Sequence, residues 1–466
     1  MLGKAAAVVR ASFTDKVFLR KAAMIAIPIA LQNMLNTITN LVDTMMIGKL
    51  GATAIASVGL ANKYFFVFSL FIFGICSGSS ILAAQFWGRR DQENIRKVLG
   101  LAMLIAFLGS LLFFIPAFLN PRFVMAVFTN DVDSQVLGAS YLAIACLTYP
   151  FIALSNVIVA MLRAIEKVRV PVITSLIAIL INIILNALLI FGLCGFPRLG
   201  VAGAAIGTLA ARITELALLL FVIFGKRSVF HANPRTFFGW HPAFLRSFAV
   251  NATPVILNEF MWGLGTTLYS VAYGRMGNDA VAAITIATTI QDIVIVLWAG
   301  LSAATAVILG NQLGAGQLER AESDSLKFFT LSFAMSLFAM VLIYVIRWPI
   351  IGVYEITPAV AEDVSRCLIV FILFTIPKMY NYILIVGVLR SGGDTRMCLF
   401  LDTSGVWLIG VPLAFLGALV WKLPIYIVYA LVLSEEVYKM LIGTWRYRQK
   451  KWVRNLALQI ETQEES

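Results

Sequence analysis

The sequence predicts an all-α integral membrane protein with twelve transmembrane helices in two pseudo-symmetric six-helix bundles. Three observations predict this fold. Hydrophobic residues make up 60% of the 466 residues and charged residues 13%, and the mean hydropathy is +0.90, outside the usual range of soluble chains. Apolar stretches of about twenty residues or more recur, and each is long enough to cross a hydrocarbon core of about 30 Å as a helix. The chain also repeats itself once.

The apolar stretches divide the chain into two bundles with short flanking parts. They lie near residues 21–47, 57–87, 98–118, 136–161, 170–192, 200–225, 248–273, 281–312, 327–347, 359–388, 397–420 and 424–446. We expect 1–20 to be a cytoplasmic amphipathic lead-in, 21–225 the N-terminal bundle, 226–247 a cytoplasmic linker, 248–446 the C-terminal bundle, and 447–466 a basic then acidic cytoplasmic tail.

The positive charge of the chain follows this topology. Most of the 36 lysines and arginines fall in the termini and in alternate loops, so the positive-inside rule places both termini in the cytoplasm and predicts a multi-pass protein of the plasma membrane. The net charge of +12 is thereby explained without a nucleic-acid partner. The five cysteines form no CxxC pair, which favours neither a disulfide framework nor a zinc site.

The two halves of the chain repeat one design. A shift of 226 residues aligns Pro28 with Pro254 and the loop GKLG with GRMG, and a shift of 227 aligns Arg163 with Arg390. Because six helices is an even number, both halves have the same orientation, which implies a pseudo-two-fold axis along the membrane normal. Paired bundles of this kind commonly carry a substrate by alternating access.

A polar stripe runs through the first predicted span. Asn33, Asn36, Asn40 and Asp43 follow one another at spacings of three, four and three, so they share one face of a helix. An ionisable residue inside a membrane costs about 2.5–3.5 kcal/mol on insertion scales. Asp43 therefore has two functional uses, carrying a proton or coordinating a small cation with amide oxygens, and one structural use, bonding to neighbouring helices.

Two further spans of the first half carry polar side chains on one face. Asn182 and Asn186 lie four residues apart on the fifth span, where bonding between helices is as good an explanation as a binding site. Thr208 lies on the sixth span. Arg212 and Glu215 lie on the same span, and we expect them either to pair with each other or to lie at the edge of the span.

The second half holds its acids elsewhere. The repeat places Tyr269 opposite Asp43, and Glu259 opposite Asn33. Glu259 is expected at mid-membrane, where it needs either a proton or a cation, and the candidate cation is Lys378. Asp292 is a further candidate member of this network. The network either moves protons or holds helices together.

Several motifs resemble one family over nearly the whole chain. They are PIALQNMLNTITNLVDTMMIGKLGATAIASVGLA, SGSSILAAQFWGRRDQENIRK, INIILNALLIFGLCGFPRLGVAGAAIGT, TPVILNEF, AGLSAATAVILGNQLGAGQLERA and VGVLRSGGDTR. With the repeat, they resemble the multidrug and toxic compound extrusion (MATE) family of cation-coupled efflux antiporters. The resemblance implies a V-shaped pair of bundles that exports bulky, often cationic amphipathic compounds in exchange for H⁺ or Na⁺.

The resemblance also implies roles for particular residues. Asp43 resembles the coupling aspartate of the family, Asn182 and Thr208 match its partners, and Glu259 resembles a glutamate used for coupling by some members. Asn186 stands where many members have an aspartate, and the region from Lys378 to Tyr380 lacks the acid that some members place on the tenth span. Both departures favour H⁺ over Na⁺, although Na⁺ at Asp43 stays open.

The resulting expectation is a secondary transporter rather than an enzyme. We predict cation coupling at Asp43, Asn182, Asn186, Thr208, Glu259 and Lys378, and a substrate cavity at Asn33, Asn36, Asn40, Tyr269 and Asp292. We expect a monomer in the lipid bilayer with no cofactor besides the coupling ion. A flippase or exporter of lipid-linked or other amphipathic metabolites is the alternative, although such flippases are expected to have several cavity arginines. An ATP-driven pump is disfavoured because no GxxxxGK[ST] loop is present.

Overall fold

The computed structural model describes residues 12–129, 131–225 and 228–464, which form helices joined by short loops. Most of the predicted lead-in (1–11), the start of the linker (226–227) and the chain end (465–466) lie outside the described residues. The α-helices of the first half are α2 (Lys16–Gly48), α3 (Ala52–Gly88), α4 (Gln92–Leu119), α5 (Pro121–Ala126), α6 (Val132–Ala145), α7 (Thr148–Ala164), α8 (Arg169–Phe191) and α9 (Val201–Ile223). A short 3₁₀ helix, η1 (Leu193–Gly195), lies between α8 and α9, and a second, η2 (Pro234–Phe237), follows α9.

The second half continues in the same manner but contains π-helical segments. Its α-helices are α10 (Pro242–Gly274), α11 (Asn278–Gly314), α12 (Leu318–Ile351), α13 (Pro358–Asn381), α14 (Thr395–Ser404), α15 (Val411–Phe415), α16 (Ile425–Arg448) and α17 (Leu456–Glu464). The π-helical segments are η3 (Tyr382–Leu389), η4 (Gly405–Gly410) and η5 (Leu416–Val420).

The predicted multi-span helical architecture is confirmed. Among the described residues, 9 helices are long and apolar enough to cross a membrane, and the bent pair of α6 and α7 raises the number to 10. The two remaining predicted spans, near 248–273 and 424–446, coincide with α10 and α16. These helices of 33 and 24 residues are also long enough to cross at about 1.5 Å per residue. Acidic side chains, including Glu259 on α10 and Glu435 on α16, make them less apolar.

The backbone repeats the internal symmetry seen in the sequence. Positive φ angles occur at matching positions: Gly51 (111°) and Gly277 (109°), Arg90 (62°) and Gly316 (75°), and Glu166 (62°) and Gly393 (73°). The first two pairs are related by the shift of 226 residues and the third by 227. The loops of both halves therefore follow the same backbone path, even where one half has glycine and the other does not.

The chain forms two compact units, each described here by itself. The N-terminal unit is Leu31–Ile256, and the C-terminal unit is Leu257–Ser466 together with the chain up to Ala30. The divisions fall inside α2 and α10, at positions related by the shift of 226, and not in the linker. Glycines explain why: a Cβ at Gly300 of α11 would lie 2.6 Å from the Ala26 carbonyl oxygen of α2, so these two helices touch backbone to backbone.

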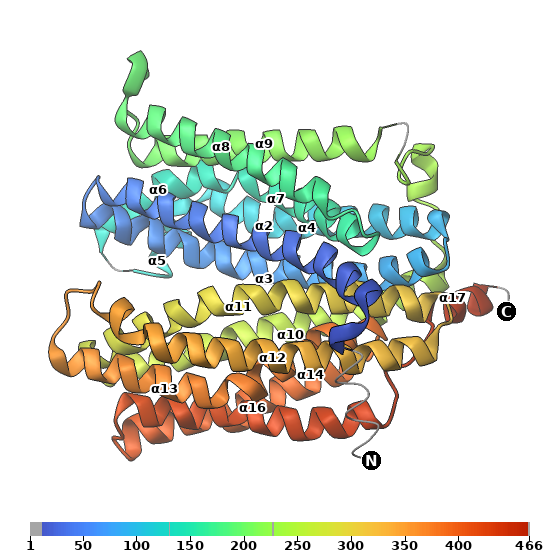
Figure 1. The fold of residues 1–466 in the computed structure, drawn as a ribbon. Coiled ribbons are helices and arrows are strands. Elements are labelled where there is room, and N and C mark those ends of the chain that lie inside the picture. The colour runs from blue at the N-terminus through green and yellow to red at the C-terminus, as the bar shows by residue number, and fades with distance from the viewer. Residues whose placement is uncertain (1–11, 130, 226–227, 465–466) are drawn as a thin grey trace. The chain divides into compact units, whose positions relative to one another are not determined.

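The same close approach recurs in the N-terminal unit. A Cβ at Gly74 of α3, the counterpart of Gly300, would lie 2.6 Å from Cα of Ile256 in α10. Side-by-side pairs complete each unit, with α8 along α9 in the N-terminal unit and α13 along α16 in the C-terminal unit (Figure 1). These two pairs position the polar residues considered next.

Candidate functional site

Four predicted residues of the N-terminal unit form one hydrogen-bonded chain. Asn186 Nδ2 on α8 donates to Asp43 Oδ1 on α2 at 2.8 Å and to Asn182 Oδ1, one turn away, at 3.3 Å. Asn182 Nδ2 in turn donates to Thr208 Oγ1 on α9 at 3.2 Å. The structure therefore brings together Asp43, Asn182, Asn186 and Thr208. This leaves the asparagines engaged with the acid as well as with a neighbouring helix.

The local sequence makes room for this chain. Asn182 and Asn186 share one face of α8 because they lie four residues apart. Gly207 of α9 lies against Asn186, and a Cβ at this position would overlap with Asn186 Oδ1. Asn186 is 0% exposed and Asn182 is 4% exposed, whereas Asp43 is partly exposed. The chain thus runs from buried amides to a partly exposed acidic residue.

Arg212 acts on Asp43 electrostatically, but its guanidinium group is paired with another carboxylate. Arg212 Nη1 lies 2.7 Å from Glu215 Oε2, which confirms the predicted pairing, and Glu215 Oε1 accepts from Ser175 Oγ at 2.8 Å. Among the ion pairs within 4.0 Å in the described part of the chain, none includes Asp43. Asp43 therefore keeps an unpaired charge or carries a proton.

The asparagine stripe before Asp43 lies largely on the surface of the N-terminal unit. Asn36 and Asn40 are exposed and Asn33 is partly buried. Their backbone carbonyls sit in the helix, and Asn33 and Asn40 also accept hydrogen bonds from Thr37 and Thr44. The amides of Asn36 and Asn40 are thus available to solvent or to a ligand.

In the C-terminal unit, Glu259 has a different partner from the one expected. Arg390 Nη2 donates to Glu259 Oε1 at 2.8 Å, and both residues are buried at 2% and 9% exposure. The candidate partner Lys378 was therefore wrong. It precedes Arg390 by twelve residues, about three turns, and so lies at another depth along the helix. Lys378 interacts electrostatically with Asp292 of α11, whose side chain is exposed.

A second ionisable group of residues escaped the sequence reasoning. Lys439 Nζ on α16 lies 3.2 Å from Glu435 Oε1 and 3.6 Å from Asp402 Oδ1 on α14. Tyr269, the counterpart of Asp43, donates its hydroxyl to Glu435 Oε2 at 2.7 Å. It is only 8% exposed and packs in the apolar core of this unit. The available signal was the spacing Glu-Glu-x-x-Lys, which places Glu435 and Lys439 one turn apart.

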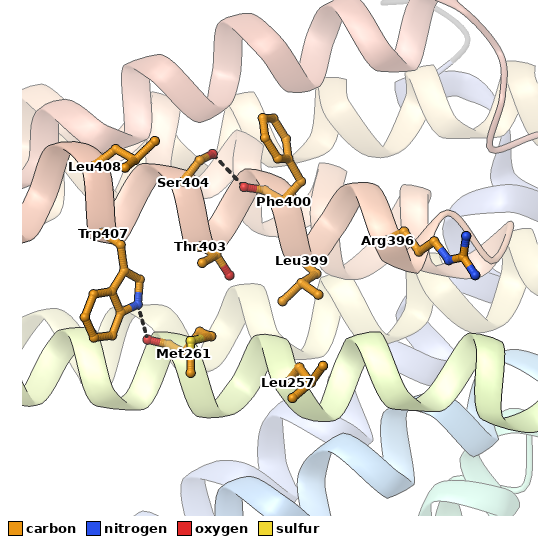
Figure 2. Close-up of a pocket in the computed structure, with 9 residues that line it drawn as sticks. All are labelled: Leu257, Met261, Arg396, Leu399, Phe400, Thr403, Ser404, Trp407 and Leu408. Carbon is orange, nitrogen blue, oxygen red and sulfur yellow. Dashed lines mark hydrogen bonds between the residues drawn. The ribbon is translucent and has the colours of Figure 1, made fainter.

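An apolar groove lies between α10 and the helix of α14 and η4. It has a volume of about 550 Å³ and is lined by Leu257, Met261, Arg396, Leu399, Phe400, Thr403, Ser404, Trp407 and Leu408. Figure 2 shows Arg396 at one end and Trp407 bridging to α10, where its Nε1 donates to the Met261 carbonyl at 3.0 Å. None of the predicted cavity residues lines this groove. Its lining suits hydrocarbon rather than ion chemistry.

The fold and the Asp43 site together define a class of protein. Multi-span helices built as two repeats, with an acidic residue and amides hydrogen-bonded inside one bundle, are typical of secondary membrane transporters. The sequence profile of the MatE family matches residues 28–188 and 254–416. The chain belongs to the MatE family.

Individual relatives agree over nearly their full lengths. The chain is 24% identical over 410 residues to the "Probable multidrug resistance protein YoeA" of Bacillus subtilis, covering 87% of this chain and 88% of that protein. It is 22% identical over 446 residues to the "Probable multidrug resistance protein NorM" of Thermotoga maritima, covering 93% of each. A MOP superfamily transporter from Pyrococcus furiosus has the same fold, with a TM-score of 0.84 at 18% identity over 92% of this chain and 95% of that one.

Proposed function

We propose that this protein is a multidrug efflux antiporter that exchanges cationic amphipathic compounds for H⁺ by alternating access between its two bundles. The observation that carries the proposal is the Asp43 carboxyl group, which is hydrogen-bonded to Asn186 and has no described cation partner. The names of the YoeA and NorM relatives support the multidrug class of substrate. We further propose that a monomer in the plasma membrane, with both termini cytoplasmic, is the transporting unit.

The arrangement of the amides favours H⁺ over Na⁺ at this site. A bound Na⁺ needs several oxygen ligands directed at one point, as hard cations do. Here the Asn186 amide nitrogen lies between the oxygens of Asp43 and Asn182 and donates to both, so it occupies the place of a cation. The Asp43 carboxyl group is also the only acid in the chain of four residues. Protonation of that group needs no further ligands.

The proposed cycle uses the charge of Asp43 as its switch. An ionised Asp43 attracts a cationic substrate, while the exposed amides of Asn36 and Asn40 supply hydrogen bonds to it. Protonation of Asp43 removes this attraction, which is about 4 kcal/mol for charges 4 Å apart at an effective dielectric constant of about 20. That difference corresponds to about a thousandfold loss of affinity. A proton entering from outside therefore releases the substrate there.

The alternative cargo, a lipid-linked pyrophosphate, receives less support. Its recognition calls for arginines that are not already paired. Within the two bundles, Arg163 donates to Gln32 at 2.6 Å, Arg212 pairs with Glu215, and Arg390 pairs with Glu259. These guanidinium groups are engaged in the protein itself.

The test is transport of a fluorescent cationic dye into proteoliposomes under an imposed pH gradient or Na⁺ gradient. We expect the parent protein to respond to the pH gradient alone and Asp43→Asn to lose this response. Glu362→Gln, an acid-to-amide change at an exposed pair with Arg366, serves as the matched control and should transport like the parent. Normal pH-driven transport by Asp43→Asn would refute the proposal, and transport driven only by Na⁺ would refute its choice of ion.

A further inference from the structure

The C-terminal unit holds a buried ionisable cluster for which the proposed function has no use. We call Asp402, Glu435, Glu436 and Lys439 the α16 cluster. Glu435, Glu436 and Lys439 lie on α16 and are 6%, 8% and 3% exposed, and Asp402 joins them from α14. Side chains of α10 and α13 donate hydrogen bonds to its carboxyl groups. Buried ionisable residues inside a membrane bundle ask for a partner or a function.

The charges of the α16 cluster do not balance. It contains three carboxyl groups and the single ammonium group of Lys439, and the neighbouring pair of Glu259 and Arg390 is neutral as a pair. Both oxygens of Glu435 are engaged, one with Lys439 and one with the Tyr269 hydroxyl. Two excess negative charges at low dielectric are costly, so the cluster favours binding of protons.

The Glu436 carboxyl group is bound by an amide and not by the cation of the cluster. Its Oε2 accepts from Asn381 Nδ2 of α13 at 2.9 Å, and the same nitrogen donates to the Glu436 backbone carbonyl at 2.7 Å. Within the described residues, no cation lies within ion-pair distance of its carboxyl group. Asp402, in contrast, has a side chain 16% exposed and so keeps some contact with solvent.

A second observation points to a missing hydrogen-bond donor in this cluster. The amide nitrogens of Asn381 and Asn258 donate to Glu436 and Asp402, respectively. Their amide oxygens are buried and have no partner among the described residues, although the two residues are only 3% and 2% exposed. A buried acceptor without a donor costs about 1–3 kcal/mol. A protonated carboxylic acid in the cluster is a donor, whereas an ionised one is not.

The backbone around the cluster is shaped to admit it. A Cβ at Gly410 would lie 2.6 Å from Glu435 Oε2, and a Cβ at Gly405 would lie 2.5 Å from Lys439 Cε. Both glycines belong to the π-helical segment η4, and a second π-helical segment, η3, begins directly after Asn381. Such segments within helices often mark functional sites.

The repeat relates this cluster to the Asp43 site. Tyr269 corresponds to Asp43 by the shift of 226, and Asp402 corresponds to Ser175 by the shift of 227. Ser175 bonds to Glu215 on α9, the sixth span of the first half, and Asp402 pairs with Lys439 on α16, the sixth span of the second half. The second half thus has a tyrosine where the first half has Asp43, and this tyrosine bonds to the carboxyl group of Glu435 on α16.

We propose that the C-terminal unit binds a second exchangeable proton, held on Glu436 Oε1 within the α16 cluster. The proton comes from water and returns to water, and no bond other than O–H forms or breaks. Further ionisable groups act on the cluster electrostatically. Tyr269 and Tyr273 of α10 and Tyr429 of α16 act on its glutamates, and Glu259, Arg390 and Cys398 act on Asp402. Glu259 and Arg390 offset each other in charge, so they do not remove the excess.

Infrared difference spectroscopy between acidic and alkaline pH tests this proposal without measuring transport. The carboxylic acid C=O band reports protonated carboxyl groups, and the protein is measured in lipid nanodiscs with Asp43→Asn in every sample. The Asp43 site then contributes nothing. We expect a pH-dependent band that Glu436→Gln removes and that Glu362→Gln, a change at an exposed ion pair with Arg366, leaves in place. Glu436→Asp, which keeps an acid, should retain the band at a shifted frequency.

Two results with the variants, and a third on adding Na⁺, would overturn the proposal of a second proton. One is an unchanged band in correctly folded Glu436→Gln, and the other is loss of the band in Glu362→Gln instead. Loss of the band on adding Na⁺ at constant pH would replace the proton by Na⁺ and also contradict the proposal. Because transport is not the readout, a failure of the Asp43 coupling role and a failure of the Glu436 proton site can be told apart.

Discussion

Replacing Arg390 with methionine should destabilise the protein more than the same change at its counterpart in the first half. Arg390 is 2% exposed and bonds to a buried carboxyl group, Glu259. Removing one partner of a buried ion pair costs about 3–5 kcal/mol, because the other charge is left uncompensated. Arg163 occupies the equivalent position but donates to the neutral amide oxygen of Gln32. Arg163→Met should therefore cost only about 1–3 kcal/mol, the penalty of an unsatisfied buried acceptor.

Thermal unfolding in detergent measures these differences. We expect the melting temperature to fall most in Arg390→Met and to recover in part when Glu259→Gln is added, since the stranded charge is then gone. Lys378→Met, which removes a cation that does not bond to Glu259, should add independently to Glu259→Gln. Equal losses in Arg390→Met and Arg163→Met, or strictly additive effects of Arg390→Met and Glu259→Gln, would refute the assigned pair.

Three further predictions concern the loops, the helix contacts and the ends of the chain. Glu166→Gly should raise the free energy of unfolding by about 0.5–1 kcal/mol, because Glu166 has a φ of 62°, which strains a residue with a Cβ, and its counterpart Gly393 has none. An unchanged melting temperature would argue against backbone strain at Glu166. Gly300→Leu should prevent correct folding, seen as aggregation in size-exclusion chromatography, because α2 passes too close for a side chain. The hydrogen bond from Lys327 lowers the pKa of Asp15, so Asp15→Asn should lower the free energy of unfolding by up to about 1 kcal/mol at neutral pH. This difference from the parent protein should vanish as acid protonates Asp15, and a difference that stays constant with pH would contradict the bond.

The sequence was sufficient for the helical fold and for its repeat. Apolar length places the spans, and the paired loops GKLG and GRMG have the same backbone path, with φ 111° at Gly51 and 109° at Gly277. The spacing of Asn182 and Asn186 was enough to put them on one face. Their meeting with Asp43 depended on family resemblance, because spacing within one helix says nothing about which helix lies opposite.

The residues that the sequence did not reveal are those whose position along the helix and whose facing side depend on tertiary packing. Arg390 looked like a residue of a cytoplasmic loop, but it follows directly on η3 and is buried against Glu259. The sequence placed Glu435 in the cytoplasmic half or the interior of the last span, without a role, and Lys439 among the charges of the cytoplasmic tail. Which face of α16 is turned inward depends on its packing against α13 and α14, and no periodicity within α16 reveals that. The sequence thus identifies polar residues within membrane helices, but the structure is needed to show which of them bond to each other.

The most direct measurement of the central claim is the release of protons when substrate binds to the purified protein. A cationic dye is added to the protein in weakly buffered solution, and the pH change is recorded. The account predicts that the parent protein releases protons and that Asp43→Asn releases fewer, because the proton of Asp43 is absent, whereas Glu362→Gln behaves like the parent. Dye binding to Asp43→Asn with the full proton release of the parent would contradict the coupling role of Asp43.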